Sequence, residues 1–97
     1  MGDSMKKKQW IFRLYIAGMT PVAEKALANI ETIANEYLAG AYEIDVVDLR
    51  EEPTRADADR IIIVPTLVRL KPLPIRKVIG DLASKAQVLA AFDLDIS

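Results

Sequence analysis

The stretch LYIAGMTPVAEKAL (Leu14–Leu27) decides the fold, because one hydrophobic period stops inside it and another begins. The residues before Gly18 alternate as in a β-strand, and those after Pro21 recur at helical spacing. Thr20 is a residue type typical of a helix N-cap, and Pro21 suits the first helical position, where its missing N–H costs nothing. The stretch therefore predicts a strand that turns sharply into a helix.

The flanking segments extend this strand and helix into a larger unit. The strand covers residues 9–18 and is largely apolar on both faces, as in the middle of a sheet. One face carries Trp10, Phe12, Leu14 and Ile16, and the other carries Ile11, Arg13, Tyr15 and Ala17. The helix covers residues 21–38 and ends before Gly40. A second alternating run, Tyr42–Leu49, predicts a strand parallel to the first.

The second half of the chain has shorter elements, separated by prolines and glycines. The patterns predict a polar helix over 53–60, a strand over 66–70, a turn over 71–74, a strand over 75–79, and a helix over 82–92 capped by Asp81. The order βαβαββα, with Pro65 just before the third strand, is that of the thioredoxin-like α/β fold. We expect a flexible N-terminal segment over 1–8 and one domain over 9–97.

The composition excludes several classes of chemistry. The chain contains no Cys and no His, which removes disulfides, thiol catalysis, the commonest zinc ligands and the usual general base at neutral pH. An acid–base pair of Asp48 and Asp81 is disfavoured for the same reason. The net charge of −1 does not favour nucleic acid, and no apolar run reaches the roughly 18–20 residues of a membrane span. We expect a cytoplasmic protein that is not an enzyme and has no cofactor, metal or membrane partner.

Four segments, LYIAGMTP, IDVVDL, ADRIIIVPTLVRLKPLPIRKVIGDL and VLAAFDL, follow one another as in the KaiB family of circadian-clock proteins, which the chain resembles over residues 8–94. The run KPLPIRKVIGDL is the most specific part. The resemblance implies a protein that binds the ATPase ring of KaiC, recruits KaiA and displaces the histidine kinase SasA. It also implies two folds: a thioredoxin-like monomer that binds KaiC, and a resting dimer or tetramer with the order βαββααβ.

The resemblance also assigns roles to individual residues. The KaiC-facing positions are basic residues: Lys25, Arg60, Arg69, Arg76 and Lys77. The segment that changes fold contains Pro65, Pro72, Pro74, Gly80, Asp81, Ala91 and Asp93. Trp10 and Tyr15 are candidates for the interface of the resting oligomer, with core packing as the alternative role.

Ala91 departs from the family pattern, in which a glycine usually occupies this position. Alanine is favoured over glycine inside a helix by about 1 kcal/mol, so Ala91 should enrich the fold in which this segment is helical. This favours the thioredoxin-like form. The departure, together with the lack of an acidic C-terminal tail, favours a divergent member, with a source outside the cyanobacteria.

Three functions follow from these observations. The first is a clock-type module that binds a KaiC-like ATPase. The second is a thioredoxin-like signalling or stress-response module with a different protein partner. The third, an oxidoreductase, is disfavoured because no thiol exists to act as nucleophile; a glutathione-binding role without a cysteine is a weak variant of it.

Overall fold

The elements of the chain follow the predicted βαβαββα order and not the alternative βαββααβ order. The computed structural model describes residues 9–94, so the predicted flexible segment 1–8 lies outside the described residues. The elements are β1 (Trp10–Ile16), α1 (Pro21–Leu38), β2 (Tyr42–Asp48), the 3-10 turn η2 (Pro53–Arg55), α2 (Ala56–Asp59), β3 (Thr66–Lys71), β4 (Arg76–Ile79) and α3 (Lys85–Ala91). No described helix is long and apolar enough to cross a membrane.

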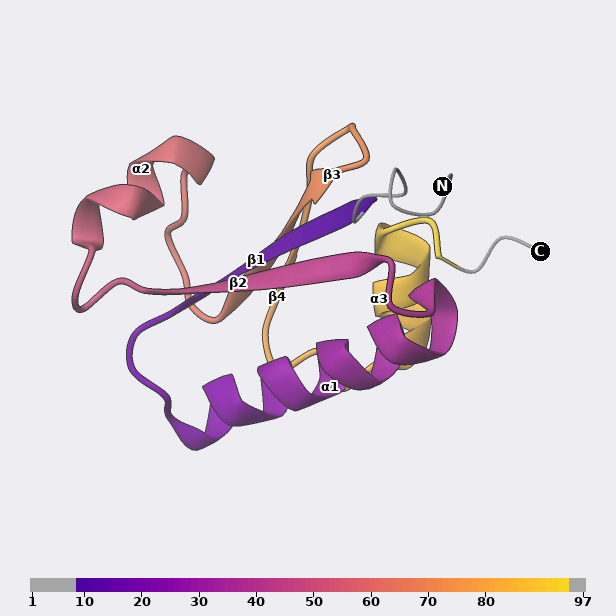
Figure 1. The fold of residues 1–97 in the computed structure, drawn as a ribbon. Coiled ribbons are helices and arrows are strands. Elements are labelled where there is room, and N and C mark those ends of the chain that lie inside the picture. Colours follow the sequence, from indigo (N-terminus) through magenta and orange to yellow (C-terminus); the bar gives the residue numbers. More distant parts are fainter. Residues whose placement is uncertain (1–8, 95–97) are drawn as a thin grey trace.

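β1 occupies the interior of a four-stranded sheet with the strand order β2-β1-β3-β4. It pairs in parallel with β2 and antiparallel with β3, and β3 pairs antiparallel with β4. A parallel pair needs a crossover connection, which α1 supplies (Figure 1). The predicted central position of the first strand is confirmed, and β2 and β4 are the two edge strands.

The two faces of the sheet bury different apolar clusters, as the alternation in the first strand predicts. The larger cluster joins β1, β3 and β4 to α1 and α3. Its most deeply buried side chains are Phe12, Leu14, Ala26, Ile30, Leu67, Val88 and Phe92. The smaller cluster, on the opposite face, consists of Tyr15, Val47 and Val68, with Leu49, Ile61, Val64 and Leu70 packed around it. In Figure 1, α1 and α2 lie on opposite sides of the sheet.

The joint between β1 and α1 forms as predicted. Gly18 has a φ of +82°, and a Cβ at this position would come within 2.7 Å of the Arg50 guanidinium carbon, so both conformation and space favour glycine. The Gly18 N–H donates to the Asp48 carboxylate at 3.0 Å. Thr20 caps the helix by accepting from the Ala23 N–H at 3.2 Å. The loop is therefore held by hydrogen bonds at both of its ends.

The last helix differs from the prediction. It begins at Lys85 rather than Leu82, and its cap is Ser84, which accepts from the Gln87 N–H at 3.3 Å. Asp81 instead accepts from the Ala83 N–H at 3.0 Å. Leu82 has a φ of +62° and is buried in the larger cluster. Leu82 therefore enters the core from a turn, and its helical spacing to Leu89 is coincidental.

A buried arginine joins the second half of the chain together. Arg69 on β3 is 2% exposed, and its guanidinium donates to the carbonyl oxygens of Phe92 and Pro74, each at 2.7 Å. It also lies 3.7 Å from the Asp93 carboxylate and 5.5 Å from the centre of the Trp10 ring. One side chain thus ties the end of α3, the hairpin loop and the start of β1 to the sheet.

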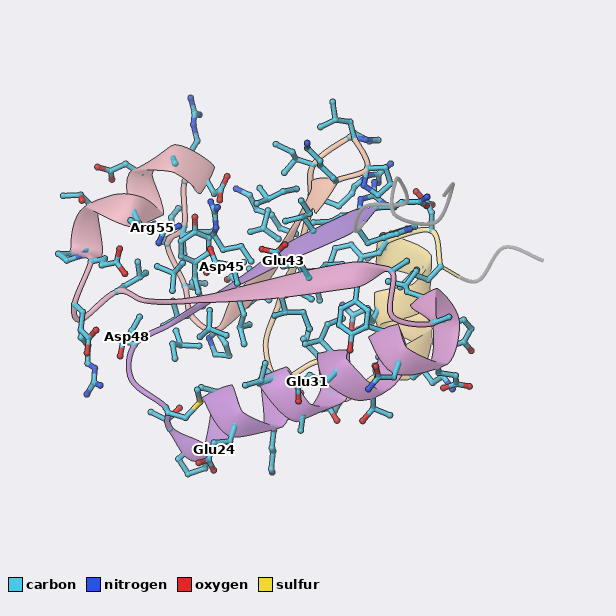
Figure 2. The ribbon with its side chains drawn as sticks, in the orientation of Figure 1. Glu24, Glu31, Glu43, Asp45, Asp48 and Arg55 are labelled. Carbon is cyan, nitrogen blue, oxygen red and sulfur yellow. The ribbon has the colours of Figure 1, made fainter. Side chains whose placement is uncertain are left out.

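A polar network covers the opposite face of the sheet. The Tyr15 hydroxyl donates to the Asp59 carboxylate at 2.6 Å, and Arg13 contacts both Asp59, at 3.6 Å, and Asp45, at 3.1 Å. Arg55 lies 3.4 Å from Asp45 (Figure 2). Burial and the Asp59 hydrogen bond raise the pKa of Tyr15, and neighbouring Arg13 partly opposes them. The network fastens η2 and α2 to β1 and β2.

Replacing Arg69 by methionine tests its role in joining the second half of the chain. The variant leaves the carbonyl oxygens of Phe92 and Pro74 without their charged donor, although it also removes the Arg69 Nε, which has no partner within residues 9–94. We expect a net loss of about 2 kcal/mol in the free energy of unfolding, measured by urea denaturation. The control is Arg76→Met, because Arg76 is the exposed cross-strand partner of Arg69. Equal losses in the two variants would contradict this role.

The raised Tyr15 pKa predicts a loss of stability at alkaline pH. The folded chain holds the Tyr15 proton above the ordinary pKa of about 10, so stability is complete below that pH and falls as the pH rises through the folded-state value. Tyr15→Phe removes this titration. It also removes the hydrogen bond to Asp59, which should lower the free energy of unfolding by about 1 kcal/mol at neutral pH. We expect the wild-type protein to lose stability faster than the variant above about pH 10. Urea denaturation measures the free energy of unfolding at each pH. An equal loss in the wild-type protein and the variant would contradict a raised Tyr15 pKa in the folded state.

Candidate partner-binding surface

The basic residues predicted to face a partner do not form one cluster. Lys25 is exposed on α1. Arg76 lies two positions from buried Val78 on β4, so the two share a face. Lys25 and Arg76 therefore lie on the side of the sheet that α1 and α3 cover, here called the helix-covered side. Arg69 is buried, so in this fold it holds the chain together rather than presenting its charge to a partner. Arg60 and Lys77 are the two members that the structure brings together, on the face that carries α2.

Arg60 and Lys77 flank a groove of about 190 Å³ on that face. The groove, here called the isoleucine groove, is lined by Arg60, Ile61, Ile62, Ile63, Thr66, Lys77 and Ile79. Ile62 is 92% exposed, Ile63 is 53% exposed and Ile79 is 57% exposed. An apolar surface bordered by charge is typical of a protein-binding site, because a contiguous exposed apolar patch usually has a partner.

Local hydrogen bonds hold the walls of the groove in place. Arg60 has a φ of +54° and ends α2, and the next N–H, that of Ile61, donates back to the Ala56 carbonyl at 2.9 Å. The Thr66 hydroxyl donates to the Ile63 carbonyl, which fixes the segment between α2 and β3. Lys77 donates from its Nζ to the Asp59 carbonyl. Lys77 therefore connects β4 to α2 across the groove.

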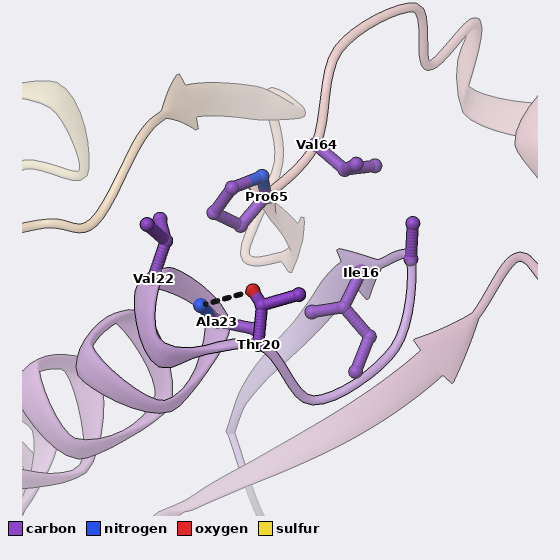
Figure 3. A pocket seen from close by; sticks show the side chains of 7 residues that line it. Ile16, Thr20, Val22, Ala23, Val64 and Pro65 are labelled. Atoms are coloured by element: carbon purple, nitrogen blue, oxygen red, sulfur yellow. Dashed lines mark hydrogen bonds between the residues drawn. The ribbon is translucent and has the colours of Figure 1, made fainter.

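A second cavity, of about 360 Å³, lies at the joint between β1 and α1 (Figure 3). It is lined by Ile16, Ala17, Thr20, Val22, Ala23, Val64 and Pro65. The Thr20 hydroxyl is engaged in capping α1, and the other lining side chains are apolar. The Val64–Pro65 bond is cis. The cavity offers no nucleophile and no acid or base, so its lining supports binding and not catalysis.

The residues predicted to belong to the fold-switching segment lie in turns, in loops and at the end of α3. Pro65, Pro72 and Pro74 all follow cis peptide bonds, and Gly80 has a φ of +112°. Ala91 is the last residue of α3. The carbonyl of Asp81 accepts from the Asn29 side chain at 2.8 Å, and Asp93 lies beside Arg69. A change of fold in this segment stays a prediction.

The two residues proposed for an oligomer interface have little free surface in this fold. Tyr15 is fully buried in the smaller cluster. Trp10 is half-buried, stacks on Phe12 with 6.1 Å between ring centres, and packs against the larger cluster. In this fold both residues pack in the core, which was the alternative role, and their part in a resting oligomer stays a prediction.

The carboxylates offer no metal centre within residues 9–94, where no three potential ligands lie close together. The two acidic residues considered as an acid–base pair also have separate roles. Hydrogen bonds from Arg50 lower the pKa of the half-buried Asp48, and the Gly18 N–H adds to this effect. Asp48 lies at the end of β2 (Figure 2) and anchors the β1–α1 loop, whereas Asp81 lies in the turn before α3.

Sequence reasoning missed the apolar part of the isoleucine groove. In the run IIIVPTLVRL the sequence predicts a strand over 66–70 and assigns no role to the isoleucines before it, and only a residue-by-residue alternation could have indicated their exposure. The three isoleucines precede the strand, so no alternation applies to them. In the hairpin, Val78 faces the core and Ile79 faces the groove. A strand of four residues is too short for this alternation to be recognised from the sequence.

Comparisons with known proteins give the family. The KaiB domain family matches residues 13–94. The circadian clock oscillator protein KaiB of Microcystis aeruginosa is 40% identical over 91 residues, which cover 94% of this chain and 88% of that protein. In fold, the chain is similar to the N-terminal domain of Synechococcus elongatus SasA, with a TM-score of 0.73, 14% identity and coverage of 93% of this chain and 89% of that one.

The fold is also similar to mitochondrial thioredoxin 3 of Saccharomyces cerevisiae, with a TM-score of 0.69, 18% identity and coverage of 95% and 85% of the two chains. These two structural likenesses confirm the thioredoxin-like fold class. The sequence matches carry the family assignment, and this family is one of non-enzymatic proteins. The chain belongs to the KaiB family.

Proposed function

We propose that the protein is a circadian-clock module that binds the ATPase ring of a KaiC-type protein and modulates its timing. Family membership supports the clock role, because the related proteins are named circadian clock oscillator proteins. The single observation that carries the binding role is the isoleucine groove, whose apolar floor is bordered by the positively charged Arg60 and Lys77. Such a surface suits a protein partner with acidic and apolar residues.

Other partners follow from the same proposal. KaiA would be recruited to the complex, and a SasA-like histidine kinase would be displaced from the ATPase. The likeness of this chain to the SasA N-terminal domain supports displacement, because two domains of one fold can compete for one surface. Both partners act in the cytoplasm, which is where we place the protein.

A second candidate function is a signalling or stress-response module with a different protein partner. The cavity beside Pro65 favours it, because this apolar hollow lies apart from the isoleucine groove and has no role in the first proposal. The two functions differ in what they need from the partner. Only the clock function requires an ATPase of the KaiC type.

A fold change would accompany the clock function. The described chain has the thioredoxin-like form, which is the form that would bind the ATPase. The resting form would be a dimer or tetramer with the order βαββααβ. The second half of the chain consists of short elements that Arg69 ties together, which supports two packings of similar free energy.

The binding experiment mixes the protein with a KaiC-type ATPase of the same organism in the presence of ATP. Size-exclusion chromatography should show a stable complex. Charge reversal of Arg60 and Lys77 together should weaken the complex at least about tenfold, since both cations border the groove. No complex after several hours would contradict the clock function and leave the second candidate.

The matched control for the groove is Lys25→Glu, because Lys25 is exposed on α1, away from α2. It should leave the affinity for the ATPase within about threefold of wild type, since exposed charges outside a contact have small effects. If Lys25→Glu weakened the complex and the double reversal did not, the ATPase would bind the helix-covered side instead.

Reverting Ala91 to glycine tests the proposed balance between the two folds. Glycine should weaken α3 by about 1 kcal/mol or less at this last helical position, and so shift the population toward the resting oligomer. Sedimentation velocity measures the oligomer distribution. The control is Ala28→Gly, an exposed interior position of α1, where glycine carries the full helix penalty in the half expected to keep its fold. An unchanged distribution in both variants would contradict the proposed role of Ala91.

A further inference from the structure

β4 is an edge strand whose outer side pairs with no other described segment. The Gly80 N–H donates to the Pro65 carbonyl at 2.9 Å, so these opposite residues form a hydrogen-bonded pair. Antiparallel pairs alternate between hydrogen-bonded and non-hydrogen-bonded, so Lys77 and Ile79 belong to the non-hydrogen-bonded pairs. The N–H and C=O groups of Lys77 and Ile79 therefore point outward, to the free edge.

The same two residues place their side chains in the isoleucine groove. Alternate residues of a strand share a face, so Lys77 and Ile79 face the groove while Arg76 and Val78 face the helix-covered side. The free backbone groups of β4 and the groove thus adjoin each other. A strand added at this edge would place every second side chain over the groove.

The charge at the groove selects the kind of strand that fits. Within residues 9–94, neither Arg60 nor Lys77 forms an ion pair, and Lys77 contacts a carbonyl oxygen rather than a carboxylate. The nearby Asp59 carboxylate is engaged by Tyr15 and Arg13 on the other side of α2. The groove therefore keeps its positive charge, which complements an acidic side chain.

The opposite edge of the sheet has the reverse character. β2 exposes Glu43, and its Asp45 is held by Arg13 and Arg55 (Figure 2). Charged side chains on an edge strand discourage pairing with an acidic segment, whereas the β4 edge combines apolar and basic side chains. The two edges would therefore discriminate between partners, and an acidic segment would select β4.

We propose that β4 binds an extended protein segment as a fifth, antiparallel strand, with an apolar side chain opposite Ile79 and an acidic side chain opposite Lys77. The apolar residue would fill the isoleucine groove, and the acidic residue, two positions later in the segment, would pair with Lys77 and Arg60. The backbone of the segment would bond the outward N–H and C=O groups of Lys77 and Ile79. The proposal rests on the proposed function only for the source of the segment, which is the ATPase.

The test uses a blocked seven-residue peptide with isoleucine at position 3, glutamate at position 5 and threonine elsewhere. NMR titration of the whole protein should show slower amide hydrogen exchange at Lys77 and Ile79, and no change at the β2 edge. Replacing the glutamate by lysine should weaken binding at least about tenfold. Moving the glutamate next to the isoleucine should also weaken it, because the two side chains then face opposite sides.

Backbone pairing is tested by methylating the peptide nitrogen atoms. Methyl groups on the isoleucine and glutamate nitrogens should abolish binding, because these N–H groups would face β4. Methyl groups on the threonine nitrogens at positions 4 and 6 should leave binding intact. Equal binding of the two methylated peptides, or protection of amides elsewhere in the protein, would overturn the proposal.

A matched pair of protein variants tests which face of β4 contacts the acidic side chain of the peptide. Lys77→Glu should weaken peptide binding about tenfold, while Arg76→Glu, the same charge change on the opposite face of β4, should change it by less than about threefold. Excess peptide should also dissociate the ATPase complex. A complex that forms without any peptide binding would overturn the strand addition alone, and peptide binding without any ATPase complex would overturn only the source of the segment.

Discussion

The buried guanidinium of Arg69 is the contact on which the second half of this fold depends. A charge in an apolar core is costly unless its donors find acceptors, and here two backbone carbonyls and one carboxylate surround it. The acceptors come from the hairpin loop and from the end of α3. The hairpin loop has no regular secondary structure, and the end of α3 is held by Arg69 together with the burial of Val88 and Phe92 in the larger cluster.

The first half of the chain depends on no comparable single contact. α1 is the longest helix described, and it packs against β1 through an apolar face that alternates with exposed polar residues. The β1–α1 joint is fixed by the Thr20 cap and by the hydrogen bond between Gly18 and Asp48. The lining of the cavity at this joint supports binding and not catalysis. The positively charged groups suited to binding a protein partner lie at the β4 edge of the sheet.

That division explains which predictions succeeded. The alternation in β1 and the helical spacing in α1 are long and strong signals, and their predicted bounds differ from the structure by at most two residues at each end. The predicted start of α3 was wrong because Leu82 lies at helical spacing from Leu89 while its backbone has a positive φ. The role of Arg69 was missed because sequence cannot show that a strand residue is surrounded by carbonyl oxygens. An arginine on a strand usually reaches solvent, and this one does not.

The sequence by itself determined the order of the elements, the central position of β1, the joint at Thr20 and Pro21, and the absence of thiol chemistry. These follow from local periodicity, capping preferences and composition, which act over a few neighbouring residues. Only the tertiary structure decided that Arg69 is buried, that Arg60 and Lys77 meet across a groove of isoleucines, and that the edge of β4 is free. Those features join residues far apart in the sequence, 23 positions in the Arg69–Phe92 contact, and packing of the whole chain brings such residues together.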